Sequence, residues 1–465
     1  MKKLAVLLLL TALGTYAESG PFLEKPYLQM GDNPSKVSEL ALLWHAADTD
    51  AAWLVEVKSA SSSKWKKMDA PSFRRVAVRG IEGHRVYHAK LQDLKAGEEF
   101  DYRVSMGETQ VFSARGRARK TSGQDYRFVV FGDCAQDTAP QRAVGYQTYL
   151  AKPDFVLIPG DIVYSRGLVS EYRVKYFPVY NADEATEAGG APLLRSTLFV
   201  AAPGNHDIAS PDVQKYPDGL AYYYYWSQPL NGPLKAIGAP STPILIGGDE
   251  DKKAFLTAAG ATYPAMANFS FDYSNAHWTV LDSNKNVDWT DPELRKWLEN
   301  DLKSAQSATW RFVSFHHPGF NSAVTHFKDQ WMRGLAEIFE KYKVNIVFSG
   351  HVHNYQRSFP LTFVSKPGGF NRTTGELPGD WALDKNYDGK TNTKPKGVLY
   401  LVTGAGGARL YNPEQQAQSD GWQPFTAKFL STVNSFTVVD AKGKQLTIKQ
   451  IGANGDELDR FVITQ

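Results

Sequence analysis

The chain has 465 residues, of which 42% are hydrophobic and 22% charged, and its formal net charge is +3. This length and composition suit two or three globular domains with ordinary hydrophobic cores, and the small net charge gives no reason to expect nucleic acid or an anionic membrane surface as a partner. A single cysteine, Cys134, excludes an intramolecular disulfide.

The first 17 residues have the features of a secretory signal peptide. Lys2 and Lys3 precede an apolar run from Leu4 to Leu13, and the small residue Ala17 follows. That run is too short to span a bilayer comfortably and no later segment is long enough, so we expect no stable membrane span. The sequence therefore predicts a cleaved leader over residues 1–17 and a secreted or periplasmic protein, with a retained N-terminal anchor as the alternative.

Residues 22–118 predict a β-sandwich. Short β-rich segments such as WLVEVKSA and HRVYHAKLQDL are separated by clusters of Gly, Ser, Asp and Pro, without a helical pattern among them. The stretch from Leu91 to Val104 resembles the fibronectin type III pattern, in which a leucine pair leads through a turn into a strand with alternating aromatic residues. Such modules are commonly structural, so we assign this one no chemistry. The polar segment 118–125 is predicted to be a linker.

Residues 126–465 predict a second domain of α/β architecture. Apolar strand candidates such as YRFVVFGD and DFVLIPGD alternate with helical stretches such as DPELRKWLENDLKSA and KDQWMRGLAEIFEKYK. The last segments predict antiparallel strands around a turn at 441–443. Two long irregular stretches, at about 208–265 and 359–396, are expected to be functional rims or mobile loops.

Five polar motifs in this domain each follow directly on an apolar strand candidate. Ligands bind at the carboxyl ends of strands in α/β sheets, so five separate segments can converge on one crevice. Each motif alone is weak, because a lone Gly-Asp pair is more often an ordinary turn. Five of them in register with five strand ends argue against coincidence. The motifs are GDCAQD (132–137), GDIVY (160–164), GNHD (204–207), HH (316–317) and GHVH (350–353).

The side chains in these motifs are typical metal ligands. A mixed set of carboxylate, phenol, amide and imidazole groups without thiolates suits Fe(III), zinc or manganese. The set is too large for one catalytic ion that must also hold water, and it predicts two ions with a bridging carboxylate, about 3.5–4 Å apart. The candidates are Asp133, Asp161, Tyr164, Asn205, His206, His316, His351 and His353.

The order of the motifs resembles that of the calcineurin-like metallophosphoesterase superfamily, and Tyr164 within GDIVY is similar to the purple acid phosphatases in particular. The resemblance extends over nearly all of the chain beyond the leader, because that family commonly has an N-terminal fibronectin-like sandwich. It implies a catalytic α/β sandwich of two mixed β-sheets flanked by helices. It also implies an Fe(III) ion bound by Asp133, Asp161, Tyr164 and His353, and a divalent ion (Zn, Mn or Fe) bound by Asp161, Asn205, His316 and His351.

The function implied is that of an exported acid phosphatase that hydrolyses small phosphomonoesters through a metal-bound hydroxide. His206 and His326 match family histidines that contact the substrate phosphate, and either could protonate the leaving group. The role of His317 stays open. A phosphodiesterase on the same metals is one alternative, and a binding or adhesion protein without turnover is another. The natural substrate and the oligomeric state are not fixed by the sequence.

Several further features have plain interpretations. Ala135 stands where the family usually has glycine, so the turn after Asp133 is expected to differ in backbone conformation. The run AYYYYW (221–226) could form aromatic walls of a substrate pocket or could simply pack. GAGGAR (404–409) predicts a tight turn behind the metal site.

DKNYDG (384–389) matches the first half of a calcium loop, but Pro395 replaces the closing glutamate, so calcium is only a minor possibility.

Overall fold

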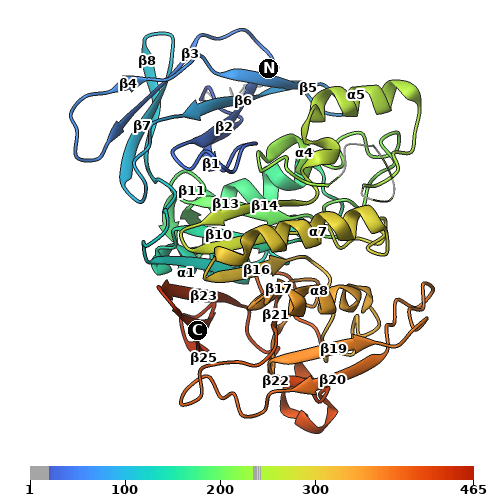
Figure 1. Cartoon of the computed structure of the whole chain (residues 1–465). Coiled ribbons are helices and arrows are strands. Elements are labelled where there is room, and N and C mark those ends of the chain that lie inside the picture. The colour runs from blue at the N-terminus through green and yellow to red at the C-terminus, as the bar shows by residue number, and fades with distance from the viewer. Residues whose placement is uncertain (1–19, 234–237, 239, 241) are drawn as a thin grey trace, which may run out of the picture.

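The structure is a computed structural model that describes residues 20–233, 238, 240 and 242–465 (Figure 1). The predicted leader, residues 1–17, lies outside this range. Within the described part of the chain, no helix combines the length and the apolar character needed to cross a bilayer.

The N-terminal part forms two four-stranded antiparallel sheets packed face to face, blue in Figure 1. Trp53 on the second sheet lies 5.4 Å from Trp44 and 5.6 Å from Tyr87 on the first, measured between ring centroids. The predicted β-sandwich is therefore present. In spatial order the first sheet is β1 (Glu24–Gln29), β2 (Leu40–Ala47), β6 (His84–Leu91) and β5 (Ser72–Val76). The second is β4 (Lys66–Lys67), β3 (Trp53–Ser59), β7 (Glu99–Met106) and β8 (Thr109–Arg117).

The rest of the chain is built on two mixed sheets, as predicted. The six-stranded sheet has the order β13 (Leu198–Ala202), β10 (Phe155–Pro159), β9 (Tyr126–Val130), β23 (Ser435–Lys442), β24 (Gln445–Gly452) and β25 (Glu457–Thr464). The seven-stranded sheet has the order β14 (Phe269–Tyr273), β15 (Ala276–Val280), β16 (Trp310–Ser314), β17 (Ile346–Ser349), β21 (Leu399–Thr403), β18 (Tyr355–Ser358) and β22 (Thr426–Leu430). Strands β9, β10 and β13 run parallel to one another, as do β15, β16, β17 and β21.

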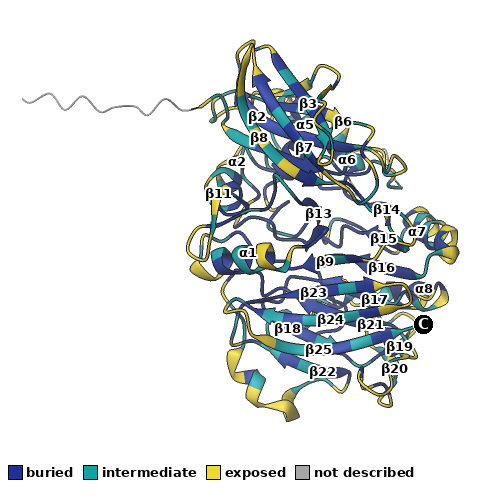
Figure 2. Cartoon of the chain, turned by 90° about the vertical axis from the view of Figure 1, so that its left-hand side faces the viewer, coloured by how far each residue is buried: buried dark blue, intermediate teal, exposed yellow. Residues whose placement is uncertain are grey.

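The parallel strands β10, β13, β15, β16, β17 and β21 are buried along their whole length, because both of their faces are covered (Figure 2). In β9, Phe128 and Val130 face the other sheet, as the two-residue period of a strand requires. Val129 faces the opposite way and belongs to the hydrophobic cluster on the outer face of the six-stranded sheet, here called the outer cluster. Between the sheets, the ring of Phe128 lies 4.9 Å from Trp278 and 5.7 Å from Phe312. An aromatic layer thus separates the two sheets.

Helices cover the outer faces. Helix α1 (Ala139–Ala151) begins at Thr138, whose hydroxyl accepts a hydrogen bond from the backbone N–H of Gln141, and packs on the six-stranded sheet. Helix α7 (Pro292–Ser304) begins at Asp291, whose carboxylate caps two backbone N–H groups. Its residues Leu294, Leu298 and Leu302, four apart, pack toward the seven-stranded sheet together with α8 (Ala336–Lys341).

Three local predictions differ from the structure. The stretch 208–265 is not irregular throughout, since it contains α4 (Tyr222–Tyr225), α5 (Asp249–Ala259) and α6 (Thr262–Ala265). The segment 359–396 contains the hairpin β19 (Leu361–Ser365) and β20 (Gly379–Leu383). The helix predicted from KDQWMRGLAEIFEKYK is split into a 3-10 turn, η3 (Trp331–Leu335), and the short α8, because Gly334 is a poor helix former at the junction.

The run AYYYYW (221–226), which could have formed a pocket wall or simply packed, is part of the hydrophobic core. All four tyrosines of α4 are buried and belong to the outer cluster of the six-stranded sheet. The remaining short elements are α2 (Val169–Glu171), η1 (Tyr172–Tyr176), α3 (Phe177–Tyr180), β11 (Asn181–Thr186), β12 (Gly190–Pro192), η2 (Ala305–Ser307), η4 (Pro413–Ala417) and η5 (Ser419–Gly421).

A buried carboxylate fastens the connection between β8 and β9 to the six-stranded sheet. The side chain of Asp154 is only 3% exposed. It accepts hydrogen bonds from Arg117 Nη1 at 3.0 Å, Lys120 Nζ at 2.9 Å and the backbone N–H of Arg127 at 2.8 Å. These three donors belong to the end of β8, the segment between the strands and the start of β9.

We expect Asp154→Ala to lower the thermal unfolding midpoint by about 5 °C or more, because it leaves buried donors and cations without their acceptor. Differential scanning fluorimetry measures the shift. Asp183→Ala is the matched control, since it removes an exposed carboxylate paired with Lys25 and should change the midpoint by about 1 °C at most. Equal shifts for the two variants would contradict the role given to Asp154.

Candidate metal centre

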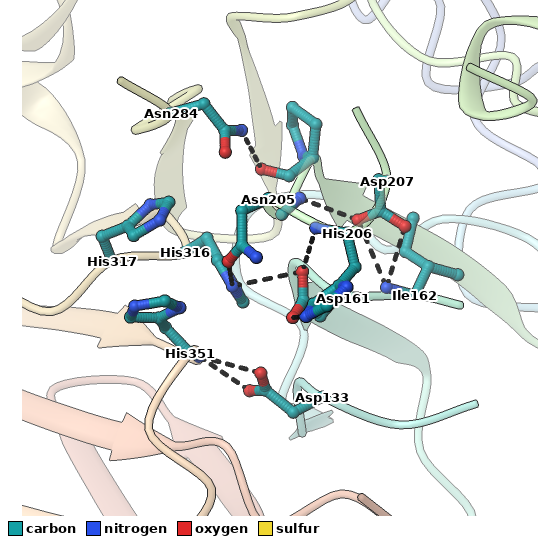
Figure 3. Close-up of polar contacts among 12 residues, drawn as sticks. Asp133, Asp161, Ile162, Asn205, His206, Asp207, Asn284, His316, His317 and His351 are labelled. Carbon is teal, nitrogen blue, oxygen red and sulfur yellow. Dashed lines mark hydrogen bonds and ion pairs between the residues drawn. The ribbon is translucent and has the colours of Figure 1, made fainter. Parts of the chain in front are cut away.

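The five sequence motifs do lie together, at the carboxyl ends of five strands. GDCAQD follows β9, GDIVY follows β10 and GNHD follows β13, three adjacent strands of one sheet. The motifs HH and GHVH follow β16 and β17, which are neighbours in the other sheet. The site therefore spans the seam between the two sheets (Figure 3).

One cluster joins the first aspartate, the tyrosine and the last histidine. The hydroxyl of Tyr164 donates to Asp133 Oδ1 at 3.1 Å and lies 2.9 Å from His353 Nε2. His353 Nε2 is also 3.5 Å from Asp133 Oδ1, while its Nδ1 is 2.7 Å from the backbone carbonyl of Arg409. The carbonyl can only accept, so Nδ1 carries the proton and Nε2 faces the cluster as a potential ligand.

A second cluster surrounds His316. Its Nε2 lies 3.0 Å from Asn205 Oδ1 and 3.3 Å from Asp161 Oδ1. Its Nδ1 donates to the carbonyl of Pro159 at 2.9 Å, which again leaves Nε2 for a ligand role. Asp161 links the two clusters, because ligand atoms of Asp133, Asp161 and His353 all lie within 4.8 Å of one another. This is the position that a bridging carboxylate needs.

His351 is turned toward a different set of neighbours from the one implied by the resemblance. Its Nε2 lies 3.0 Å from Asp329 Oδ2, and its ring lies 3.9 Å from the ring of His326. It still belongs to the second cluster, since ligand atoms of His316, His317 and His351 lie within 4.8 Å of one another. His317 is thus part of the site's inner wall, and its Nδ1 is 2.9 Å from the hydroxyl of Ser283.

The two histidines expected to act on substrate lie at the rim. The side chains of His206 and His326 are 33% and 32% exposed, whereas those of His316, His351 and His353 are at most 8% exposed. His206 Nδ1 donates to the carbonyl of Ser165 at 2.7 Å. His326 Nδ1 is 3.0 Å from Asp329 Oδ2, so one carboxylate oxygen contacts both His326 and His351.

Backbone geometry holds the strand-end loops in place. Asp133, Asp161 and His351 all have positive φ angles, of 57°, 51° and 66°, a conformation that is uncommon for non-glycine residues and that the surrounding contacts must stabilise. The carboxylate of Asp207 accepts backbone hydrogen bonds from Ile162 at 3.0 Å and Gly204 at 2.7 Å, and so joins two of the loops.

Ala135 itself does not have a positive φ angle. The positive φ falls on Asp133, and Ala135 continues the extended backbone in a parallel bridge with Val163. Alanine is therefore tolerated at this position without strain. Cys134 is buried in the outer cluster.

The buried carboxylates of the site are paired with imidazoles. Asp133 and Asp161 are buried, and in the described part of the chain their ion-pair partners are histidines alone. Burial by itself would raise the pKa of Asp161, but the charge and hydrogen bond of His316 outweigh it and lower that pKa. Burial and the charge of Asp161 raise the pKa of Asp207 to about 8. Burial and the charge of Asp133 also raise the pKa of Tyr164 well above its ordinary value.

The turn GAGGAR lies against the first cluster, as predicted. Gly406 N donates to Gly132 O at 3.0 Å and Ala408 N donates to Asp133 O at 2.9 Å. The calcium candidate gains no support, because the carboxylate of Asp384 accepts from the backbone N–H of Lys396 at 2.8 Å and that of Asp388 from Lys390 at 2.7 Å. Both side chains therefore cap their own loop.

Three residues near the site were missed by the sequence reasoning. Asp329 follows no strand, Ser283 looks like an ordinary loop serine, and Tyr411 comes after a glycine-rich turn. Tyr411 stacks on His353 with ring centroids 4.0 Å apart and an interplanar angle of 10°. Two signals were available: Ser283 closely follows the carboxyl end of β15, and His326 and Asp329 are three residues apart as in a turn.

Comparison with known proteins agrees with these motifs. Residues 126–355 match the family model described as calcineurin-like phosphoesterase. Purple acid phosphatase 1 of Ipomoea batatas is 25% identical over 293 residues, which cover 59% of this chain and 52% of that protein. Fe(3+)-Zn(2+) purple acid phosphatase 12 of Arabidopsis thaliana is 23% identical over 328 residues, which cover 66% of this chain and 61% of that protein. The chain thus spans between half and two thirds of these relatives.

A solved structure shares the architecture. Purple acid phosphatase PPD1 from yellow lupin (Lupinus luteus) seeds superposes with a TM-score of 0.62 at 18% sequence identity, over 94% of this chain and 74% of that one. Identity this low establishes the fold alone. Residues 126–355 therefore carry a calcineurin-like phosphoesterase domain, and in its motifs and fold the chain is purple acid phosphatase-like.

Proposed function

We propose that this protein is a dinuclear metal-dependent acid phosphatase that hydrolyses phosphomonoesters, exported by means of the leader over residues 1–17. The observation that carries the proposal is the pair of linked donor clusters at the seam of the two sheets. One cluster contains Asp133, Tyr164 and His353, and the other contains Asn205 and His316. Asp161 lies between them.

The residues present fit two cations. Two buried carboxylates without a lysine or arginine partner in the described part of the chain are costly unless a cation compensates them. A trivalent ion suits the cluster with the phenol, since Tyr164 must lose its proton to bind and its raised pKa opposes that loss. The neutral amide of Asn205 suits a divalent ion. The name of the Arabidopsis relative specifies iron and zinc, and we propose the same pair here.

When bound, two such ions would neutralise the phosphate charge and make a water molecule nucleophilic at acid to neutral pH. The chain itself supplies orientation and a proton. Asp133, Tyr164 and His353 would hold the first ion, Asn205, His316 and His351 the second, and Asp161 both. His206 and His326 use Nδ1 for hydrogen bonds to Ser165 and Asp329, and the Nε2 atom of His206 lies 3.9 Å from Asp161 Oδ2. Each Nε2 atom can then bind a phosphate oxygen or protonate the leaving oxygen.

Close backbone approach keeps Asp161 in its place. A Cβ atom added at Gly204 would overlap the backbone nitrogen and Oδ1 of Asp161. Only glycine therefore allows the loop after β13 to pass so near to the carboxylate that links the two clusters. By contrast, a Cβ atom added at Gly248, just before α5, would meet no other atom within 4 Å.

We expect Gly204→Ala to displace Asp161 and to lower metal content below one ion per chain, measured by inductively coupled plasma mass spectrometry. Gly248→Ala is the control and should keep the metal content of the unmodified protein. If Gly204→Ala retains two ions per chain, Asp161 does not hold them in the way proposed.

A spectroscopic test addresses Tyr164. The iron-loaded protein should show a visible charge-transfer band that Tyr164→Phe abolishes, because phenylalanine keeps the ring but removes the ligand oxygen. Tyr411→Phe is the matched control, since Tyr411 stacks on His353 and its substitution keeps that stacking. A band that survives in Tyr164→Phe would refute the ligand role.

An ester panel tests the reaction and its main rival. We expect kcat/KM for p-nitrophenyl phosphate to exceed that for bis(p-nitrophenyl) phosphate by about tenfold or more, a difference of roughly 1.4 kcal/mol in transition-state stabilisation. The opposite ratio would make the protein a phosphodiesterase. Asp161→Ala should abolish both hydrolysis and metal binding, and if it changes neither, the protein is not a metallophosphatase at this site.

A further inference from the structure

A carboxylate to which the proposed reaction gives no role lies beside the loop that follows Tyr164. It belongs to Glu171 of α2, whose side chain is only 12% exposed. We propose that Glu171 is a positioning residue of the metal centre, which acts through the backbone of this loop on the phenol of Tyr164 and the ring of His206. The proposal rests on the phosphatase function given above and adds one residue to it.

Glu171 binds three backbone N–H groups of the loop at once. One oxygen of its carboxylate accepts from Ser165, and the other accepts from Arg166 at 3.0 Å and from Leu168 at 3.1 Å. The bond from Leu168 is an ordinary cap of the short helix α2, since a glutamate in the first turn often accepts from the residue before the helix. The bonds from Ser165 and Arg166 reach beyond the helix, and a cap does not need them. They hold the backbone immediately after Tyr164.

A lysine four residues further along binds the other end of the same peptide group. Lys175 donates from its ammonium group to the carbonyl oxygen of Tyr164, and its Nζ lies 3.5 Å from Glu171 Oε1. The carbonyl of Tyr164 and the N–H of Ser165 belong to one peptide, so the ion pair holds both polar groups of that peptide. Hydrogen bonds to charged groups are about twice as strong as neutral ones, so the orientation of this peptide is firmly fixed.

The loop held in this way carries contacts to both groups of the site. The carbonyl of Ser165 accepts from His206 Nδ1 at 2.7 Å, and the ring of Tyr164 lies 4.5 Å from the ring of His206. The hydroxyl of Tyr164 in turn lies 3.1 Å from Asp133 Oδ1 and 2.9 Å from His353 Nε2. A displaced loop would therefore move the phenol of the first cluster and the histidine at the rim together.

The segment that carries the ion pair is supported by the N-terminal sandwich. Lys175 belongs to η1, a turn of π-helix, and such turns are frequent at functional sites. Directly after η1, the ring of Phe177 lies 5.2 Å from Tyr27 of β1 and 5.3 Å from His45 of β2, measured between ring centroids. The sandwich, to which we assigned no chemistry, thus backs the segment that orients Tyr164.

Glu171→Gln tests the positioning role with little change in side-chain shape, because it removes the negative charge and one of the two acceptor oxygens. The loop keeps the bond from Ala221 N to Gly167 O at 2.9 Å, so we expect an unchanged circular dichroism spectrum and retained iron. The visible band of the iron-loaded variant should shift in wavelength, because the orientation of the phenol changes. Its kcat for p-nitrophenyl phosphate should fall about tenfold with a smaller change in KM, since a misdirected proton donor affects mainly the transition state.

Lys175→Met gives a second, independent test of the same peptide. Methionine has a side chain of similar length but cannot donate to the carbonyl of Tyr164, so we expect a shifted band and a fall in kcat of about tenfold here as well. If the two residues hold one peptide, the double variant should lose much less kcat than the roughly hundredfold product of two independent effects. A loss of about hundredfold in the double variant would overturn the joint action of the pair.

Glu184→Gln is the control, since this glutamate is exposed in β11, and it should keep the band, kcat and KM of the unmodified protein. If Glu171→Gln lowers the thermal unfolding midpoint but keeps the band and kcat, Glu171 only caps α2. That result overturns the proposal and leaves the phosphatase function intact. If the unmodified protein shows neither a visible band nor hydrolysis of p-nitrophenyl phosphate, the phosphatase function itself fails, and Glu171 has no metal centre to position.

Discussion

The buried pair Asp133 and Asp161 is the constraint on which the rest of the site depends. Two carboxylates at the seam of two hydrophobic sheets are costly unless positive charge compensates them. Among the residues that the structure describes, their neighbours are imidazole, amide and phenol groups, and neither carboxylate is paired with a lysine or arginine. Both aspartates have left-handed backbone conformations, and Gly204 lies directly against Asp161. These two features hold the carboxylates in place. Stability is given up locally so that cations can be bound.

The fold could be predicted well where its central strands are buried on both faces. Runs such as FVLIP leave few alternatives to a central strand, and the caps at Thr138 and Asp291 mark two helices by side-chain chemistry alone. Prediction was poorer where tertiary contacts decide. Gly334 breaks a helix that its apolar spacing favours, and the tyrosines of α4 are core residues inside a stretch that lacks any clear period.

The site was predictable to the extent that its ligands come at strand ends. The motifs at β9, β10, β13, β16 and β17 can be located from sequence because each follows an apolar run directly. Asp329 and Tyr411 reach the site from irregular segments, so only the packed structure shows that they contact His351 and His353. The orientation of the His351 ring depends likewise on neighbours that are distant in sequence.

The aromatic layer between the two sheets has a second consequence. Phe128, Trp278, Phe312 and Phe348 fill the space between the sheets just below the site, and the two halves of the ligand set stand on opposite sheets. The thickness of this layer therefore sets how far the aspartates of one sheet stand from the histidines of the other. The core thus acts as a spacer, and a change in side-chain volume between the sheets would change the distance between the two halves of the ligand set.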